Sequence, residues 1–394
     1  MKFNPHLFMI FLGITFVSFN LRVPITSVGP ITNLIQAEYS LTNSMAGFIT
    51  TLPLLAFSIF SPFVSKISHK FGYGLTMLGG LILIILGELI RSYTDVYGLF
   101  IGTMFIGLGI AIGNVLIPSV IKHKFKKNVG SIISIYITSM CIFAALGAGI
   151  SIPATDILGW NTSLAMWVVL AFITLLIWLP QLKKSEEYNN SDDLAIEKIM
   201  KSKTIWKSPL AWWVTLYMGT QSLLFYTLIA WIPSIIIFKG LDNHFAGMMV
   251  LLFQLVGLPA TLLVPIIANK IKHQKLIATI ISLNYLAGMI IFLITTSSFG
   301  IIISMVFIGI GMGGSISLAI GFITQRTPHA KKAAELSGMS QSVGYLLAAV
   351  GPILLGFMFD ITKSWTSSII VLIISTILLI LFGLKAGKAE LTHH

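Results

Sequence analysis

The sequence predicts an all-α membrane protein with twelve transmembrane helices arranged as two six-helix bundles. Hydrophobic residues make up 56% of its 394 residues and charged residues only 10%, against about 25% charged residues in soluble domains. Apolar stretches of about 20 residues, enough for a helix to cross a bilayer, recur along the whole length. The basic residues lie in alternate loops, as they do in chains that cross a membrane repeatedly.

The expected spans follow from these apolar stretches. In chain order they cover residues 7–31, 45–66, 74–92, 97–118, 129–152, 161–180, 209–235, 246–268, 276–296, 300–322, 334–357 and 366–385. A long polar segment that mixes lysines with carboxylates separates the sixth span from the seventh. The predicted domains are therefore an N-terminal bundle (1–182), a cytoplasmic linker (183–207) and a C-terminal bundle (208–394).

The distribution of positive charge predicts the orientation. With the N-terminus inside, 21 of the 25 Lys and Arg residues fall in inward loops and tails, and three fall on the outward side. This asymmetry places both termini in the cytoplasm, and the excess of Lys over Arg suggests a bacterial cytoplasmic membrane. The net charge of +12 thus indicates topology, and we expect no nucleic-acid partner. The first apolar run is expected to be an uncleaved helix, because no small-residue cleavage site follows it.

The two halves resemble each other at an offset of about 200 residues, as the halves of many secondary transporters do. The matching positions are Gly107 and Gly109 with Gly309 and Gly311, Pro30 with Pro233, Pro62 with Pro265, and Trp160 with Trp365. Such a repeat predicts two similar bundles with a binding site near the middle of the membrane. The glycines themselves are expected to allow close helix packing.

Arg22, in the middle of the first span, is the strongest functional signal. A central Arg costs about 2.5–3.5 kcal/mol on insertion scales, so such residues usually mark a functional site. Polar residues lie on both sides of it at spacings of three and four, namely Thr15 and Ser18 before it and Thr26 after it. This spacing predicts a polar face on the first helix. The alternative is that a carboxylate neutralises Arg22, and only Glu88 lies inside a span to do so.

Six uncharged polar residues in other spans could orient a small solute beside Arg22. They are Asn114, Tyr136, Gln221, Tyr226, Gln341 and Tyr345. Each could equally bond one helix to another, because amides and hydroxyls commonly do so in membranes. Glu88 is the candidate for proton coupling, with the alternative that it reaches outward and pairs with Arg91. The spans contain no histidine and one cysteine, Cys141, and we expect no metal and no cofactor.

Four segments resemble the cyanate permease and 2-nitroimidazole transporter family, a branch of the major facilitator superfamily. They are Phe19–Pro30, Gly109–Lys122, Trp213–Pro233 and Gln341–Pro352. The resemblance covers essentially all twelve spans. One departure is Val23, which stands between Arg22 and the proline that often follows the family's Arg directly, so the kink of the first helix could be displaced.

The resemblance implies secondary active transport of a small anion or planar nitrogen-containing solute, cyanate-like or nitroimidazole-like, by alternating access. One fixed cation among amides and aromatic rings suits such a solute. The alternative within the same fold is efflux of drugs or metabolites. A membrane enzyme is not expected, because no cluster of carboxylates, histidines or a Ser–His pair lies within the spans. The expected partners are the solute, the lipid bilayer and a coupled proton, and the expected state is a monomer.

Overall fold

The computed structural model describes residues 5–125, 129–182, 205–268, 270–271, 273–327 and 330–388, and these residues are helical throughout apart from short turns. Eleven segments are long and apolar enough to cross a membrane. One of them, Ser131–Gln181, is 51 residues long and contains both the fifth and the sixth expected span. The predicted fold class is thereby confirmed. Most of the expected linker (183–207) lies outside the described residues, and only its end, Ile205–Lys207, is described, as the short 3-10 helix η3.

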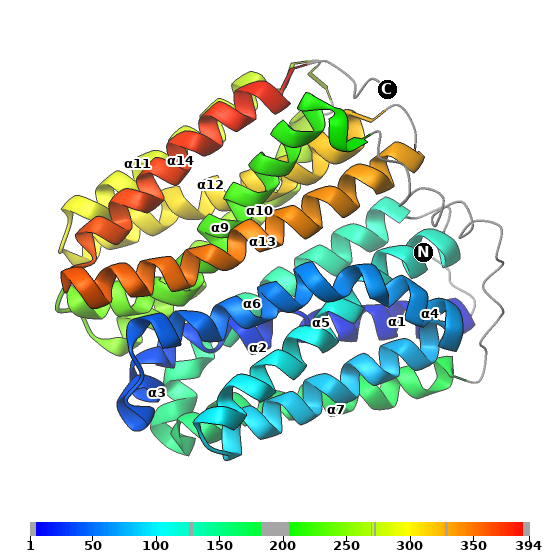
Figure 1. Ribbon diagram of the computed structural model, residues 1–394, viewed down its shortest axis with the longest axis horizontal. Helices are drawn as coiled ribbons and strands as arrows, with labels where there is room; N and C mark the ends of the chain where they lie inside the picture. The colour runs from blue at the N-terminus through cyan, green and yellow to red at the C-terminus, as the bar shows by residue number, and fades with distance from the viewer. Residues whose placement is uncertain are drawn as a thin grey trace. The chain divides into compact units, whose positions relative to one another are not determined.

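The helices follow the expected spans closely. In the first half they are α1 (Pro5–Asn20), α2 (Val23–Thr26), η1 (Gly29–Ile31), α3 (Thr32–Tyr39), α4 (Asn43–Tyr93), α5 (Val96–Lys124), α6 (Val129–Ala165), α7 (Trp167–Trp178) and η2 (Leu179–Gln181). In the second half they are α9 (Pro209–Phe238), α10 (Asn243–Ala268), α11 (Lys275–Ile294), α12 (Ser298–Gln325), α13 (Ala330–Thr362) and α14 (Thr366–Ala386). Figure 1 colours them in this order.

Two of these helices turn sharply at a glycine between successive spans. In α4 the turn is at Gly72 (φ 78°, ψ 156°), and in α6 it is at Gly159 (φ 78°, ψ 158°). A positive φ of this size with extended ψ is accessible to glycine and costly for residues with a side chain. Each glycine lies between two consecutive expected spans, at the turn that joins them.

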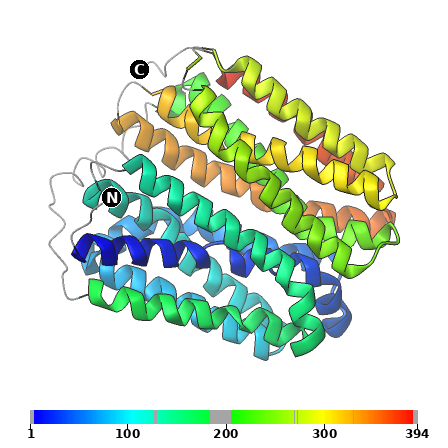
Figure 2. The same ribbon diagram turned by 180° about the vertical axis from the view of Figure 1, so that it is seen from behind.

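The described chain forms two compact units. The first contains α1 to α7 without residues 42–47, and the second contains α9 to α14 together with residues 42–47. In the first unit α1 packs against α6 and α7, and α2 packs against α6 (Figure 2). In the second unit α10 and α11 both pack against α12, and α13 packs along α9.

Glycines set the closest helix contacts in both units, and they do so at matching positions. A Cβ on Gly107 of α5 would lie 2.8 Å from Pro53 Cα in the first half of α4, and one on Gly109 would lie 2.7 Å from Ile84 Cγ1 in its second half. In the second unit Gly309 of α12 approaches the Phe253 backbone of α10, and a Cβ on Gly311 would lie 2.6 Å from Tyr285 Cβ of α11. The glycine repeat seen in the sequence is therefore a repeat of helix packing.

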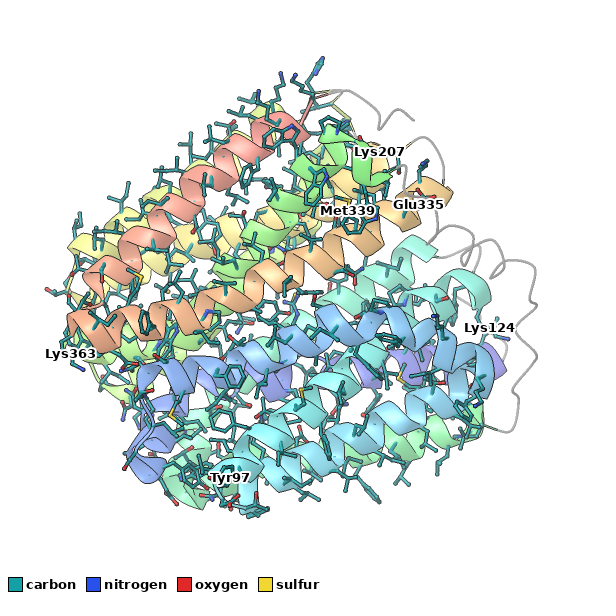
Figure 3. The ribbon with its side chains drawn as sticks, viewed as in Figure 1. Tyr97, Lys124, Lys207, Glu335, Met339 and Lys363 are labelled. Carbon is teal, nitrogen blue, oxygen red and sulfur yellow. The ribbon has the colours of Figure 1, made fainter. Side chains whose placement is uncertain are left out.

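Charged and polar side chains lie at the ends of the long helices. Tyr97 and Lys124 mark opposite ends of α5, and Glu335 and Lys363 mark opposite ends of α13 (Figure 3). Lys332 and Glu335 form an ion pair of 3.2 Å at the start of α13. Arg22, Glu88 and Arg91 all belong to the first unit.

Candidate functional site

The first span is broken at Arg22. Helix α1 ends at Asn20, and the one-turn helix α2 begins at Val23, so that Arg22 lies at the joint with φ −129° and ψ −32°. Pro24 explains the break, because it has no N–H to donate to the carbonyl of Asn20 one turn earlier.

The backbone of Arg22 is bonded to the turn that follows it, and its side chain is half-buried. Its carbonyl accepts hydrogen bonds from the N–H groups of Ile25 and Thr26, both at 3.0 Å. Its side chain is neither fully buried nor exposed.

The other polar residues expected on this face of the first helix are used for packing. Ser18 and Thr26 are fully buried, and Thr26 Oγ1 donates to the carbonyl of Ala144 on α6 (2.8 Å). Asn20 Nδ2 donates to Thr174 Oγ1 of α7 (2.8 Å). These three polar side chains therefore bond or pack against neighbouring helices of the first unit.

Asn114 and Tyr136 form a polar pair in the same unit. The Tyr136 hydroxyl of α6 lies 3.4 Å from Asn114 Oδ1 of α5, within reach of a weak hydrogen bond. Tyr136 is buried and Asn114 is half-buried. The structure therefore brings together two of the site residues predicted from the sequence. The Asn114 amide also has an Nδ2 group that can donate to a solute.

The second unit contributes aromatic rings. The rings of Tyr226 on α9 and Tyr345 on α13 have centroids 6.3 Å apart, and Phe225 lies 5.0 Å from Tyr226 in an edge-on arrangement. Gly219 and Gly344 let α9 and α13 approach this closely, because a Cβ on Gly219 would lie 3.1 Å from Gly344 Cα. The two predicted tyrosines therefore belong to one aromatic cluster.

The two predicted glutamines of the second unit bond to serines on their own helices. Gln221 Nε2 donates to Ser222 Oγ (2.8 Å), and Gln341 Nε2 donates to Ser337 Oγ (3.1 Å). Gln221 is buried and Gln341 is half-buried. Each of these hydrogen bonds lies within one helix, so neither of them joins two helices.

The alternative expectation was that Glu88 reaches outward and pairs with Arg91. The structure places Glu88 differently. Both side chains are buried, at 0% and 1% exposure, and neither Glu88 oxygen has a hydrogen-bond partner among the described residues. The Arg91 guanidinium instead points into the unit, where Nη1 donates to the carbonyl of Pro24 (2.6 Å).

Sequence reasoning missed two residues that support the broken span, Arg91 and Ser151. Ser151 Oγ of α6 donates to the carbonyl of Ser27 (2.8 Å). Their contacts are to backbone atoms, which leave no trace in side-chain patterns. Among the described residues, no group of three or more His, Cys, Asp or Glu side chains is arranged to hold a metal ion.

Comparison with known proteins gives consistent matches over nearly the whole chain. The sequence profile of the Major Facilitator Superfamily matches residues 8–352. An uncharacterized transporter of Bacillus subtilis, YycB, is 46% identical, with 97% of this chain and 94% of that protein aligned. The 2-nitroimidazole transporter of Escherichia coli is 38% identical over 95% of this chain and 94% of its own length.

More distant matches extend the comparison to another transporter and to the fold. The cyanate transport protein CynX of Escherichia coli is 23% identical, with 90% of this chain and 91% of that protein aligned. The crystal structure of a D-xylose-proton symporter superposes with a TM-score of 0.79 over 98% of each chain, at 15% sequence identity. At that identity the likeness concerns the fold alone.

Proposed function

The chain belongs to the Major Facilitator Superfamily and is a membrane transporter, not an enzyme, and we propose that it carries a small anion or planar nitrogen-containing solute by alternating access. The observation that supports this proposal most directly is the position of Arg22 at the break of the first span. A helix break at mid-membrane, with a cation beside it, is where transporters of this general design bind their solutes.

The chemistry of Arg22 narrows the solute class. A guanidinium offers several N–H donors in a plane and binds carboxylate-like or nitro-like groups through two parallel hydrogen bonds. Asn114 and Tyr136 would add neutral hydrogen bonds from the same unit. A single fixed cation suits a solute with one negative charge or a strong hydrogen-bond acceptor, and the cargo named for two relatives, 2-nitroimidazole and cyanate, meets this description.

The second unit would supply flat apolar contact. Tyr226 and Tyr345, with Phe225 beside them, can stack on or edge against a planar ring, while Gln221 and Gln341 can orient it. The first unit contains a fixed charge, and the second contains aromatic faces. The alternative of drug or metabolite efflux uses the same residues and differs in the direction of net transport.

The proposed location is the bacterial cytoplasmic membrane with both termini on the cytoplasmic side and a monomer as the working unit. The orientation is supported by the distribution of basic residues, with 21 on one side and three on the other. Labelling of cysteines introduced into the loops with a membrane-impermeant reagent, in cells and in inverted vesicles, tests this orientation.

Glu88 is our candidate for the coupled proton. It is the acidic side chain buried in the interior of the described spans, and its two oxygens lie without hydrogen-bond partners there. A group in such surroundings is unusual in a membrane and favours a functional role. Replacing it by glutamine, which has the same shape and cannot ionise, should abolish accumulation driven by a pH gradient while leaving exchange of labelled for unlabelled solute intact. Loss of both activities, or of neither, contradicts this role.

The test of the solute site is flux in proteoliposomes loaded with labelled 2-nitroimidazole or cyanate. Arg22→Ala removes charge-assisted hydrogen bonds worth about 1.5–3 kcal/mol, so KM should rise at least about tenfold. Arg22→Lys keeps the charge but loses the planar pair of donors, and it should recover part of the loss. Uptake by R22A at the wild-type KM would remove Arg22 from the site. Flux measured in both directions separates uptake from efflux.

A further inference from the structure

The break in the first span leaves several backbone carbonyls without their helical donors, and those of Pro24 and Ser27 are two of them. In a continuous helix the carbonyl of Pro24 would accept from the N–H of Val28, but that N–H donates to Ile25 instead (3.4 Å). In the same way, the N–H of Ile31 donates to Val28 (3.1 Å) and not to Ser27. Since an unpaired carbonyl inside a membrane costs several kcal/mol, each of the two needs a donor from elsewhere.

Two neighbouring helices supply these donors. Arg91 of α4 donates from Nη1 to the Pro24 carbonyl (2.6 Å), and Ser151 of α6 donates from Oγ to the Ser27 carbonyl (2.8 Å). The segment between them is one turn of helix, and the Arg22 carbonyl is bonded to its N–H groups. A displacement of Pro24 would therefore move Arg22 with it.

The contact made by Arg91 differs from the one made by Ser151. The Ser151 hydroxyl lies near the Ser27 carbonyl and also near the Gly147 carbonyl of its own helix, and its single proton serves one of them at a time. Arg91 is 1% exposed, and its Nε and Nη2 have no hydrogen-bond partner among the described residues. Glu88, three residues earlier, is a buried carboxylate whose charge acts on Arg91, so the hydrogen bond that the structure gives the guanidinium is the charge-assisted one to Pro24.

A cavity of about 10 Å³ lies beside this contact, lined by Pro24, Val28, Arg91 and Thr103 among other residues. This volume is about that of one water molecule, so the packing has a small gap next to the Pro24 carbonyl.

We propose that Arg91 is the positioning residue for Arg22, and that it acts through the Pro24 carbonyl. The inference rests on the proposed function, in which Arg22 binds the solute. Without Arg91 the Pro24 carbonyl loses its donor, the one-turn helix shifts toward the cavity, and the Arg22 guanidinium leaves the place where it meets the solute.

Cys141 provides a readout of the Arg22 position that needs no solute. It is the only cysteine in the chain and is half-buried, and two influences act on its thiol, burial being the larger and the charge of Arg22 the smaller. A neighbouring cation favours the thiolate, which is the form that reacts with alkylating and thiosulfonate reagents. The rate at which Cys141 reacts with methyl methanethiosulfonate therefore reports whether Arg22 is in place.

The experiment compares this rate in purified, monodisperse variants. Arg22→Gln and Arg91→Met should each slow the reaction relative to the wild type, because the thiolate loses a neighbouring cation. Arg91→Lys should recover part of the rate. The matched control is Arg326→Met, since Arg326 is likewise buried and donates to a carbonyl, that of Ala386 (2.9 Å), in the other unit. It should react at the wild-type rate.

A wild-type rate in R91M, with R22Q slowed, would overturn the inference. A wild-type rate in R22Q would overturn it too. An R326M variant slowed as much as R91M would also overturn it, because the loss of any buried arginine would then loosen the fold and slow the reaction. If R91M does not yield folded protein, Arg91→Gln decides by the same comparison, since its shorter neutral side chain cannot reach Pro24 in the same way.

Transport provides the second measurement and separates the inference from the proposed function. With 2-nitroimidazole and cyanate as probes, R91M should raise KM more than it lowers kcat, which indicates lost solute binding. If R91M lowers kcat alone, the positioning role is contradicted. If the wild type moves neither probe, the proposed solute class fails, while the Cys141 rates still decide whether Arg91 positions Arg22.

Discussion

Replacing Gly311 by alanine tests the packing repeat most directly. A Cβ at this position of α12 would lie 2.6 Å from Cβ and 2.8 Å from Cα of Tyr285 on α11. Carbon atoms in contact settle at about 3.5–4.0 Å, so the two helices would have to separate by about 1 Å. Tyr285 is fully buried and one of the atoms is backbone, so no side-chain rotation relieves the overlap. Overpacking of this kind costs about 1–3 kcal/mol.

Gly321→Ala is the matched control, on the same helix and with the same chemical change. A Cβ there would meet only Gln325 Nε2, at 4.0 Å. Both variants gain the same preference of alanine for helix, about 1 kcal/mol, so their difference isolates the steric cost. At about 2 °C per kcal/mol for a large domain, G311A should melt at least about 2 °C below G321A in detergent.

The assay is thermal unfolding of both variants at one scan rate in one detergent. The unfolding of membrane proteins is often irreversible, so the comparison is of apparent melting temperatures under matched conditions. If G311A melts at or above G321A, the close contact between α11 and α12 does not constrain the fold, and the reading of the glycine pairs as packing contacts is refuted.

Two further predictions concern individual hydrogen bonds. In a double-mutant cycle, Asn20→Ala and Thr174→Val should show a coupling of about 0.6 kcal/mol, the usual value for a bond between membrane helices, and full additivity would contradict the 2.8 Å contact. Burial lowers the pKa of Lys239, whose Nζ donates to the Thr295 carbonyl (2.7 Å), so the unfolded chain binds the proton more tightly. The wild type should therefore gain stability relative to Lys239→Met as the pH rises toward about 10.4, and parallel melting curves from pH 7.5 to 10.5 would contradict this.

The fold was predictable because few backbone structures can cross a bilayer. Apolar length fixed the spans, and the glycines of α5 and α12 pointed to close packing before any contact was known. Gly107 and Gly109 meet the two halves of α4, and Gly309 and Gly311 meet α10 and α11 in the same order. The pairing of each glycine with a particular helix could not be predicted, because the choice of neighbour depends on the whole bundle.

The candidate site was predictable in its residue types and less so in its geometry. Tyr226 with Tyr345 and Asn114 with Tyr136 are brought together within their units, as their positions at mid-span suggested. The polar face of the first helix was expected to run through Thr26, which assumed a continuous helix. The break before Val23 rotates the residues that follow, and Thr26 turns to the backbone of α6 instead.

The environment of Arg91 shows why partners of buried cations are hard to predict from sequence. The sequence argument looked for a carboxylate and found Glu88, yet three basic side chains here bond to backbone carbonyls where helices break or end. Arg91 donates to Pro24, Arg326 to Ala386 at the end of α14, and Lys239 to Thr295 just after α11. Carbonyls at helix ends carry partial negative charge and lack helical donors. They can therefore hold cations in a chain with 25 basic but only 13 acidic residues, and a helix break inside a span provides such an acceptor at membrane depth.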